Sequence, residues 1–303
     1  MTTTEVAPLP VGAGDRDPAV MVRGLCKAYG GRPVLHGVDL EVRRGECFAL
    51  LGPNGAGKTT TIEILEGVRR RDGGQVRVLG EDPATAGRGW RDRIGVVSQG
   101  EGAGQALTVR ETLDHFAGYR GRSRPTDELL DTVGLAGQAA TRVGALSGGQ
   151  RRRLAVALGV QGAPELLFID EPTTGMDPVA RRGFWQLVRD LRAAGTTVLL
   201  TTHYLDEAAE LADRVGVVAG GRLLEVAPPA ELGARLRRRA TVRWREDGGW
   251  RELRTEAPAA VLRDLLATAP HEVPGLSVTR PGLEDVYLQL VGAVPTDSEG
   301  DPR

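Results

Sequence analysis

The sequence predicts an α/β fold with a mostly parallel central sheet. Two observations carry this prediction. Continuously apolar segments such as 47–51 and 166–169 have the composition of strands that are buried on both faces. Segments with the helical spacing of apolar residues alternate with these strands along much of the chain. Such alternation is typical of a parallel sheet that is covered by helices on both faces.

The composition of the 303 residues is that of an ordinary globular protein. Hydrophobic residues make up 41% of the chain, and the formal net charge is −1. A nucleic-acid binder usually carries a basic excess, so we expect no nucleic-acid partner. No stretch approaches the roughly 18 uninterrupted apolar residues of a membrane span. The N-terminus also lacks the basic and then apolar layout of a signal peptide. We therefore expect a cytosolic chain unless a partner tethers it.

The elements of a large first domain, at 19–230, follow a lead at 1–18 that we expect to be disordered. Cys26 and Cys47 both fall in expected strands, and we expect buried, reduced thiols rather than a disulfide or a metal site. The segment at 204–218 reads as a helix and then a strand. Other strands are expected at 19–30, 32–42, 46–52, 75–80, 93–99, 164–171 and 196–203, and other helices at 58–68 and 178–195.

The run at about 100–162 is expected to be wholly helical and to be inserted between two strands of the sheet. "TVRETLDHFAGY" opens with a capping box formed by Thr108 and Glu111, and it then places Leu113 and Phe116 on one face. "TDELLDTVGL" reads as a second capped helix. The insertion therefore predicts a helical subdomain.

The character of the chain changes again after the prolines at 228–229. "ELGARLRRR" reads as a basic helix, and the segments "ATVRWRE" and "WRELRTE" precede a helix at 258–268. We predict a small C-terminal α+β module at 240–291. The polar tail at 292–303 is expected to be disordered.

The segment "GPNGAGKT" is a phosphate-binding loop motif between an expected strand and an expected helix. Its glycines let backbone N–H groups point inward, and the helix N-terminus adds positive potential. Lys58 is expected to bridge the β- and γ-phosphates, and the Thr59 hydroxyl is expected to bind Mg²⁺. The expected nucleotide contacts of this segment are Gly52, Pro53, Asn54, Gly55, Ala56, Gly57, Lys58, Thr59 and Thr60.

Polar residues at the ends of three strands predict the rest of a catalytic site. The apolar strand of "LLFIDEP" ends at Asp170, which is placed to bind Mg²⁺; Glu171 should point elsewhere because strand side chains alternate, and it is placed to polarise an attacking water. His203 ends the next strand and is expected to sense the γ-phosphate. Gln99 ends an earlier strand, where its amide is expected to reach the metal or the water. The alternative for Asp170 and Glu171 is a pair of solvated acids at a strand end, and the alternative for His203 is an ordinary core histidine.

The segment "LSGGQRRRLAV" opens a helix in the inserted subdomain. A helix N-terminus is an anion-binding site, and here Ser147 adds a hydroxyl while Gly148 and Gly149 expose backbone amides. Its place in the insertion is expected to be too far from Lys58 for both to hold one phosphate. For the arginines at 151–153, we expect at least two to lie on a solvated helix face.

These motifs together resemble the ATP-binding cassette (ABC) transporter ATPases. "GPNGAGKTT", "SQ", "LSGGQ", "LLFIDE", "GMD" and "TTH" occur in the order and approximate spacing of that family over about residues 20–230. The resemblance implies a P-loop NTPase fold with an antiparallel β subdomain and ATP with Mg²⁺ as ligands. It also implies a homodimer that encloses two ATP molecules, in which Ser147 to Gln150 of one copy complete the site of the other.

The resemblance assigns further roles. Tyr29 matches the aromatic residue that stacks on adenine, and Asp177 matches a loop that crosses the dimer interface and links the two sites. The helices after Gln99 resemble the surface that receives a short helix from the membrane subunit. Such a cassette would lie at the cytoplasmic face of the cell membrane, bound to a separate permease.

Softer similarities favour one subfamily. "TTTIEILEGVRRRDGGQVRVLG" and "RPGLEDVYLQLVG" resemble bacterial drug-resistance exporters of the daunorubicin type, in which the C-terminal module is thought to support dimerisation. The chain departs from the family pattern in lacking proline before Gln99 and in having Met176 where leucine is commoner. A non-transport ABC ATPase acting on ribosomes or DNA, a catalytically inactive binding module and an importer ATPase are the alternatives.

Overall fold

The computed structural model describes residues 17–98, 106–246, 249–268 and 273–292. A six-stranded sheet forms its centre, with the strand order β5-β6-β7-β3-β8-β9. All neighbouring pairs are parallel except β8 and β9. The predicted α/β fold with a mostly parallel sheet is therefore confirmed. The strands are β3 (Cys47–Leu51), β5 (Ile94–Val97), β6 (Leu166–Asp170), β7 (Thr197–Thr202), β8 (Arg214–Ala219) and β9 (Arg222–Ala227).

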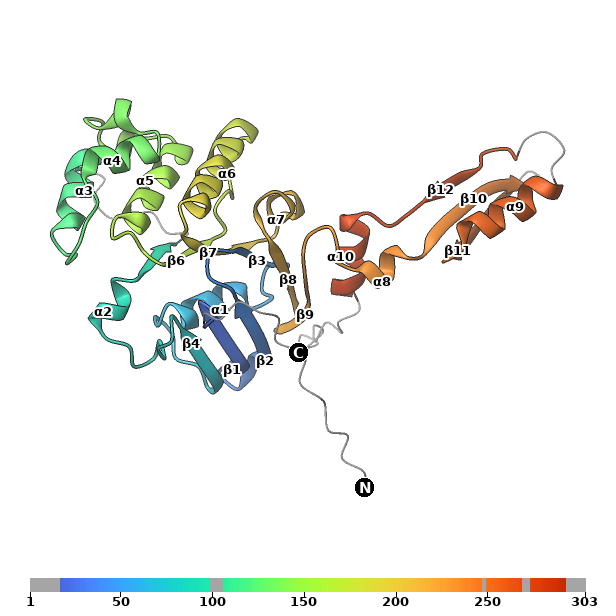
Figure 1. Cartoon of the computed structure of the whole chain (residues 1–303), viewed down its shortest axis with the longest axis horizontal. Helices are drawn as coiled ribbons and strands as arrows, with labels where there is room; N and C mark the ends of the chain where they lie inside the picture. Colours follow the sequence, from blue (N-terminus) through green and yellow to red (C-terminus); the bar gives the residue numbers. More distant parts are fainter. Residues whose placement is uncertain (1–16, 99–105, 247–248, 269–272, 293–303) are drawn as a thin grey trace, which may run out of the picture.

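A second, antiparallel sheet packs beneath the central one. Its order is β2-β1-β4, from β1 (Val20–Tyr29), β2 (Arg32–Val42) and β4 (Gly73–Val78). Helix α1 (Lys58–Leu65) lies between the two sheets, as Figure 1 shows. The buried side chains of α1 share one hydrophobic core with both sheets. The antiparallel subdomain therefore covers one face of the central sheet through α1.

Helices cover the opposite face of the central sheet. Strand β3 shows how the two faces divide, because Phe48 belongs to the core around α1 while Cys47 and Ala49 belong to the core around the other helices. Strand β3 is buried on both faces, as its continuous apolar sequence predicts. The helices on this side are α3 (Val109–Ala117), α4 (Thr126–Thr132), α5 (Gly148–Val160), α6 (Pro178–Ala193) and α7 (Leu205–Leu211).

The described part of the insertion contains helices α3, α4 and α5 and two short 3-10 turns. The predicted capping box is confirmed, since the Thr108 hydroxyl accepts from the Glu111 amide and the Glu111 carboxylate accepts from the Thr108 amide. The next predicted helix is also present, as α4, but its expected side-chain cap was wrong. Pro125 occupies the cap of α4, and the Thr126 hydroxyl donates to Asp114 at 2.5 Å, so a side chain of α3 competes for it.

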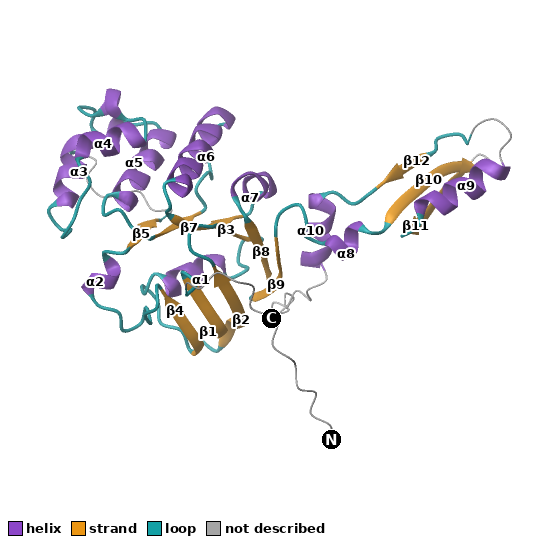
Figure 2. Cartoon of the chain, in the orientation of Figure 1, coloured by secondary structure: helices purple, strands orange, loops and turns teal. Residues whose placement is uncertain are grey.

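The C-terminal part forms a sheet of order β11-β10-β12 with helix α9 packed against β10. Figure 2 shows these elements extending away from the rest of the chain, with α8 and α10 at their base. The expected basic helix is only the four-residue α8, because Gly233 at φ 64° precedes it and a strand follows at Ala240. The elements are α8 (Ala234–Arg237), β10 (Ala240–Glu246), β11 (Gly249–Thr255), α9 (Pro258–Thr268), β12 (Ser277–Thr279) and α10 (Leu283–Gly292).

Several expectations from the sequence differ in detail from the structure, and others concern residues that the structure does not describe. Cys47 is buried but Cys26 is only half-buried, and both are free thiols. The sequence did not predict helix α2 (Arg88–Arg91), because four residues are too few to show a helical period. It did not predict edge strand β9 either. The expected lead and tail lie outside the described residues almost entirely, and Gln99 lies outside them too.

Candidate active site

The phosphate-binding loop, Gly52–Thr59, connects β3 to α1. At two positions of the loop, steric constraints explain why the residue is glycine. Gly57 lies in the left-handed region at φ 99°, where it caps α1. A Cβ atom at Gly52 would lie 2.2 Å from the Val218 carbonyl oxygen of β8. The loop therefore needs glycine for its curvature and for its close approach to the neighbouring strand.

Lys58 is the first residue of α1, and its side chain is buried under this loop. The ammonium group donates to the carbonyl oxygens of Gly52, at 2.9 Å, and of Pro53, at 3.1 Å. It also lies 3.4 Å from Glu171 Oε1, and the Lys58 side chain is only 3% exposed. A buried cation is tolerated only when it is paired and hydrogen-bonded, and Lys58 has both kinds of partner.

The two residues predicted to bind Mg²⁺ lie together. The Thr59 hydroxyl donates to Asp170 Oδ2 at 3.2 Å, at the end of β6. Thr201 of β7, which the sequence analysis missed, donates its hydroxyl to the same carboxylate. Among the described residues, no group of three or more acidic, histidine or cysteine side chains is placed to hold a metal ion. One hydroxyl and one carboxylate fit Mg²⁺, which keeps waters and phosphate oxygens as its other ligands.

Glu171 faces the loop for a reason other than the expected alternation of strand side chains. It follows the end of β6 with a left-handed backbone at φ 43°, and its amide donates to the Thr201 hydroxyl at 3.0 Å. A non-glycine residue in this conformation carries backbone strain, and such strain is concentrated at functional sites. The turn brings the Glu171 carboxylate next to Lys58.

His203 follows β7 and lies near the same oxygen of the Glu171 carboxylate as Lys58. Its Nδ1 atom is 3.5 Å from Glu171 Oε1, although the geometry does not form a hydrogen bond. Its ring packs against Tyr204 with 4.1 Å between centroids. The structure thus brings Lys58, Glu171 and His203 together at the carboxyl ends of adjacent strands, where ligands of parallel sheets bind.

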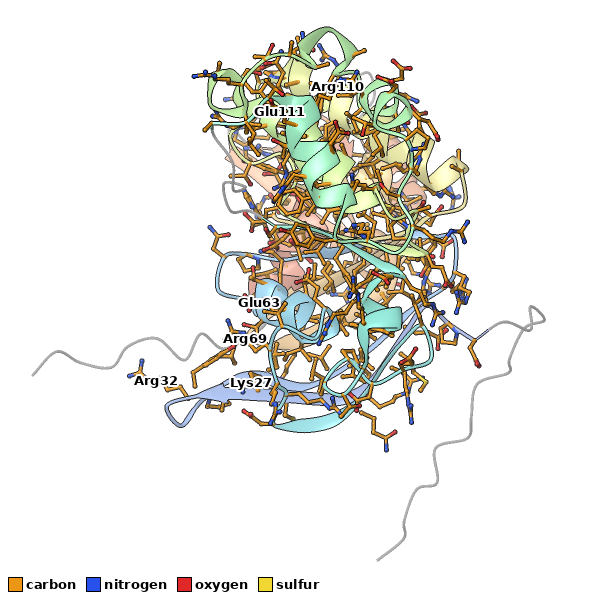
Figure 3. The ribbon with its side chains drawn as sticks, turned by 90° about the vertical axis from the view of Figure 1, so that its left-hand side faces the viewer. Lys27, Arg32, Glu63, Arg69, Arg110 and Glu111 are labelled. Carbon is orange, nitrogen blue, oxygen red and sulfur yellow. The ribbon has the colours of Figure 1, made fainter. Side chains whose placement is uncertain are left out.

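Tyr29 is the last residue of β1 and is 39% exposed. Two cations flank its ring, with Lys27 Nζ 5.4 Å and Arg69 Cζ 5.1 Å from the centroid. Figure 3 shows Lys27, Glu63 and Arg69 close together, with Arg32 farther out. Arg69 is held by Glu63 at 2.6 Å. The ring is thus exposed and engaged by two cations, and the stacking of adenine on it stays a prediction.

The SGGQ turn, Ser147–Gln150, begins helix α5. Ser147 is the N-cap and forms a capping box, because its hydroxyl accepts from the Gln150 amide and the Gln150 side chain accepts from the Ser147 amide. Ser147 and Gly148 are exposed, and nothing lies within 4 Å of a Cβ built on Gly148. Among the described residues, no hydrogen bond or ion pair joins this turn to the phosphate-binding loop.

Arg152 has contacts that the sequence analysis did not anticipate. Its guanidinium donates to three carbonyl oxygens: Ser98 at 2.6 Å, Asp170 at 2.5 Å and Pro172 at 3.1 Å. Burial lowers its pKa. The expectation that at least two of the three arginines are solvated was wrong, since Arg153 also reaches a carbonyl, that of Val133, and only Arg151 is exposed.

Asp177 is the N-cap of α6. Its carboxylate accepts from the amides of Val179, at 2.8 Å, and Ala180, at 2.9 Å. These two hydrogen bonds hold the pKa of Asp177 below its usual value. The residue therefore stabilises the helix start in this chain, whatever it does between two copies.

Comparisons with known proteins agree with this arrangement. The family model described as "ABC transporter" matches residues 35–174. A fluoroquinolones export ATP-binding protein of Mycobacterium tuberculosis (strain CDC 1551 / Oshkosh) is 41% identical over 286 residues, which cover 90% of this chain and 93% of the relative. A daunorubicin resistance ATP-binding protein of Streptomyces coeruleorubidus is 39% identical over 91% of this chain and 96% of its own.

A solved structure of an ATP-binding subunit of an ABC transporter has a TM-score of 0.65 and 27% identity, over 72% of this chain and 92% of that one. None of the helices in the described part of the chain has the length and apolar character that crossing a bilayer requires. The similarity to these two relatives extends over nearly their whole length, and the fold matches that of the solved structure over 72% of this chain. The chain belongs to the ABC transporter family, among its ATP-binding subunits.

Proposed function

We propose that this protein hydrolyses ATP to power an exporter of a drug or another small hydrophobic compound, working at the cytoplasmic face of the membrane. The two relatives described above are an export protein and a resistance protein, and the similarity of each covers about nine-tenths of this chain. ATP-binding subunits of ABC exporters act with separate membrane permease subunits. The observation that carries the proposal is the placement of the Glu171 carboxylate between Lys58 and His203.

Each group has a task in this reaction. The amides of the phosphate-binding loop hold the phosphate tail, and Lys58 exchanges the Gly52 and Pro53 carbonyls for phosphate oxygens. Glu171 orients and polarises the attacking water as general base. Thr59 and Asp170 would hold Mg²⁺, which would neutralise charge on the phosphates. His203 faces the same space and holds the γ-phosphate.

We propose further that two copies pair head to tail. The exposed donors of the SGGQ turn support this idea, because among the described residues none of them bonds to the phosphate-binding loop of its own chain. Ser147 of one copy would meet the phosphate held by Lys58 of the other, so that ATP stabilises the dimer. The helical insertion would carry the resulting movement to the permease.

The test replaces the general base. We expect Glu171→Gln to keep ATP binding, to lower turnover by roughly 10²–10⁴-fold, and to accumulate an ATP-bound dimer. Turnover is measured by phosphate release and the dimer by light scattering.

The matched control is Glu165→Gln. Glu165 immediately precedes β6, at the end of the strand opposite to Glu171, where its carboxylate pairs with Arg44 and Arg93. This variant should turn over ATP at the wild-type rate. Normal turnover by Glu171→Gln would show that another group activates the water.

A further inference from the structure

The C-terminal sheet has two unlike faces. Strand β10 places Val242 opposite Leu253 of β11 and Val278 of β12, and the Val242 side chain is fully buried. The next residue along β10 in either direction points to the other face. That face carries Thr241, which pairs with Arg254 and Thr279.

A cavity of about 690 Å³ lies against this second face. Residues from the end of α8, from all three strands of the sheet and from α10 line it together. The charged side chains of its wall are four arginines and two acids, namely Arg238, Arg239, Arg254, Arg280, Glu256 and Asp285. Cations therefore outnumber anions two to one around this space.

The acids of the wall are already engaged. Glu256 lies 3.5 Å from Arg239, and Asp285 accepts a hydrogen bond from the Gly282 amide at 2.8 Å. Within the described part of the chain, Arg238 and Arg280 form no ion pair. Among the described residues, Arg254 has one ion-pair partner, Glu252 at 3.7 Å, which is not part of the wall. The cavity thus keeps an excess of positive charge that its own residues do not neutralise.

We propose that this cavity binds a phosphate-bearing ligand. The planar guanidinium group donates two parallel hydrogen bonds to a phosphate. Several arginines around one space therefore suit a doubly charged phosphate better than they suit a singly charged carboxylate ligand. A volume of about 690 Å³ exceeds that of a bare ion and lies in the range of small-molecule sites. The phosphate therefore belongs to a larger molecule, either a soluble phosphate ester or a phospholipid headgroup.

The position of the cavity gives such a ligand a structural consequence. Helix α10 contributes Asp285 and Gln289 to the wall. The same helix packs against β8 of the central sheet. Its Val286 side chain is fully buried against Gly233, and a Cβ atom added to Gly233 would lie 2.1 Å from Val286 Cγ1. A ligand in the cavity would connect the C-terminal sheet to a helix anchored on the ATP-binding part. This site is separate from the phosphate-binding loop and does not depend on the proposed ATPase function.

The test uses the full-length chain, with inorganic pyrophosphate and vesicles of phosphatidylglycerol mixed with phosphatidylcholine as probes. Hydrogen exchange read by mass spectrometry separates the two regions, because pyrophosphate at the phosphate-binding loop protects only peptides around residues 52–60. Binding in the cavity should protect peptides around 236–241 and 277–286. Vesicle binding is measured by co-sedimentation.

The variant is the double substitution Arg254→Gln with Arg280→Gln, and the matched control is Arg251→Gln. Arg251 lies on the same strand as Arg254 but on the opposite face, and it is also exposed and paired, with Glu246 at 3.2 Å. Charged hydrogen bonds are strong enough that losing two cations should weaken binding by at least about tenfold. The control should bind like the wild type.

Protection by pyrophosphate that the double variant loses would support a soluble ligand. Sedimentation with anionic vesicles that the double variant loses, without protection by pyrophosphate, would support a lipid headgroup. If neither probe binds in this region, or if the double variant and the control bind alike, the proposal is wrong.

Discussion

The phosphate-binding loop and the SGGQ turn are two anion-binding helix starts that differ in what surrounds them. The loop is closed by its own chain, since the Lys58 side chain is 3% exposed and meets two carbonyl oxygens and a carboxylate. The SGGQ turn is exposed, and within the described part of the chain its Ser147 hydroxyl bonds only to the start of its own helix. The charged groups of the phosphate-binding loop are therefore already paired within the chain, whereas the SGGQ turn exposes hydrogen-bond donors to solvent.

The difference teaches how a site can be built from two halves. A buried lysine must have acceptors in the absence of ligand, so the loop supplies carbonyls that phosphate oxygens can replace. A neutral helix start has no such cost, because water satisfies its amides. Helix α5 connects the two halves, with Ser147 at its start and Arg152 near the end of β6.

The largest expected effect on ATP affinity tests the closed half. Lys58→Ala should weaken ATP binding by about 10–100-fold, because charge-assisted hydrogen bonds to the phosphates are lost. A fluorescent nucleotide titration measures this effect. The control is Arg23→Ala, which removes an exposed cation of β1 that lies 3.7 Å from Glu41, and it should change affinity far less. Equal losses in the two variants would mean that general positive charge, rather than the place of Lys58, holds the nucleotide.

The second prediction tests the exposed half. Ser147→Arg should leave ATP affinity of the monomer within roughly twofold of its normal value, because the SGGQ turn does not touch the loop of its own chain. It should abolish the ATP-dependent dimer, measured by light scattering in the Glu171→Gln background. Ser123→Arg adds the same charge at an exposed loop position of the same subdomain and should still dimerise. A dimer formed by Ser147→Arg would contradict the head-to-tail arrangement.

The sequence predicts the closed half better than it predicts the connection between the halves. Lys58, Thr59 and Asp170 lie in motifs whose local geometry follows from glycine, a strand end and a helix start, and the structure brings these residues together. Glu171 was expected near this site, but the reason given was wrong. A left-handed backbone turns its side chain, and alternation along a strand cannot reveal such a turn.

Arg152 and Thr201 were missed for a different reason. Their partners are backbone carbonyls and a carboxylate on other elements, so no local pattern distinguishes them. An arginine at the start of an exposed-looking helix reads as solvated, and only the packing of α5 against the ends of β5 and β6 shows otherwise. Contacts between elements distant in sequence depend on the tertiary fold, which spacing along the chain does not encode.

The third prediction tests this connection between the halves. Arg152→Met removes three hydrogen bonds from carbonyl oxygens at the ends of β5 and β6. We expect the free energy of unfolding to fall by about 2 kcal/mol and kcat to fall by roughly tenfold, while KM for ATP stays the same. A purely structural role would lower stability without this division between kcat and KM.

Two variants control for the loss of charge and length. Arg151→Met changes the exposed neighbour, whose single hydrogen bond of this kind goes to the Leu146 carbonyl, and should be nearly neutral. Arg152→Lys keeps the charge and should recover part of kcat. A kcat unchanged by Arg152→Met would mean that α5 does not position the acidic strand end.

The smallest expected effect concerns the pH dependence of stability, in which the two halves should differ. Burial raises the pKa of Glu66, at the end of α1, to about 8, and the charges of Asp170 and Glu63 add to the rise. Unfolding returns the pKa to its ordinary value of 4.5. The neutral acid therefore contributes stability that is complete below about pH 4 and is lost as the pH rises through about 8. Glu66→Gln should remove this loss, which we expect to be about 1 kcal/mol after screening.

The matched control lies in the helical insertion. Glu111 accepts hydrogen bonds from Thr108, and these bonds hold its pKa below the usual value, so it stays ionised above about pH 5. Glu111→Gln should therefore lower the melting temperature by the same amount at about pH 6 and about pH 9, whereas the effect of Glu66→Gln should grow between them. The first turn of α5 carries no acid, so variants of the SGGQ turn should show no such dependence. If Glu66→Gln changed the melting temperature by the same amount at both pH values, Glu66 would titrate outside this pH range. The two halves would then not differ in how their stability depends on pH.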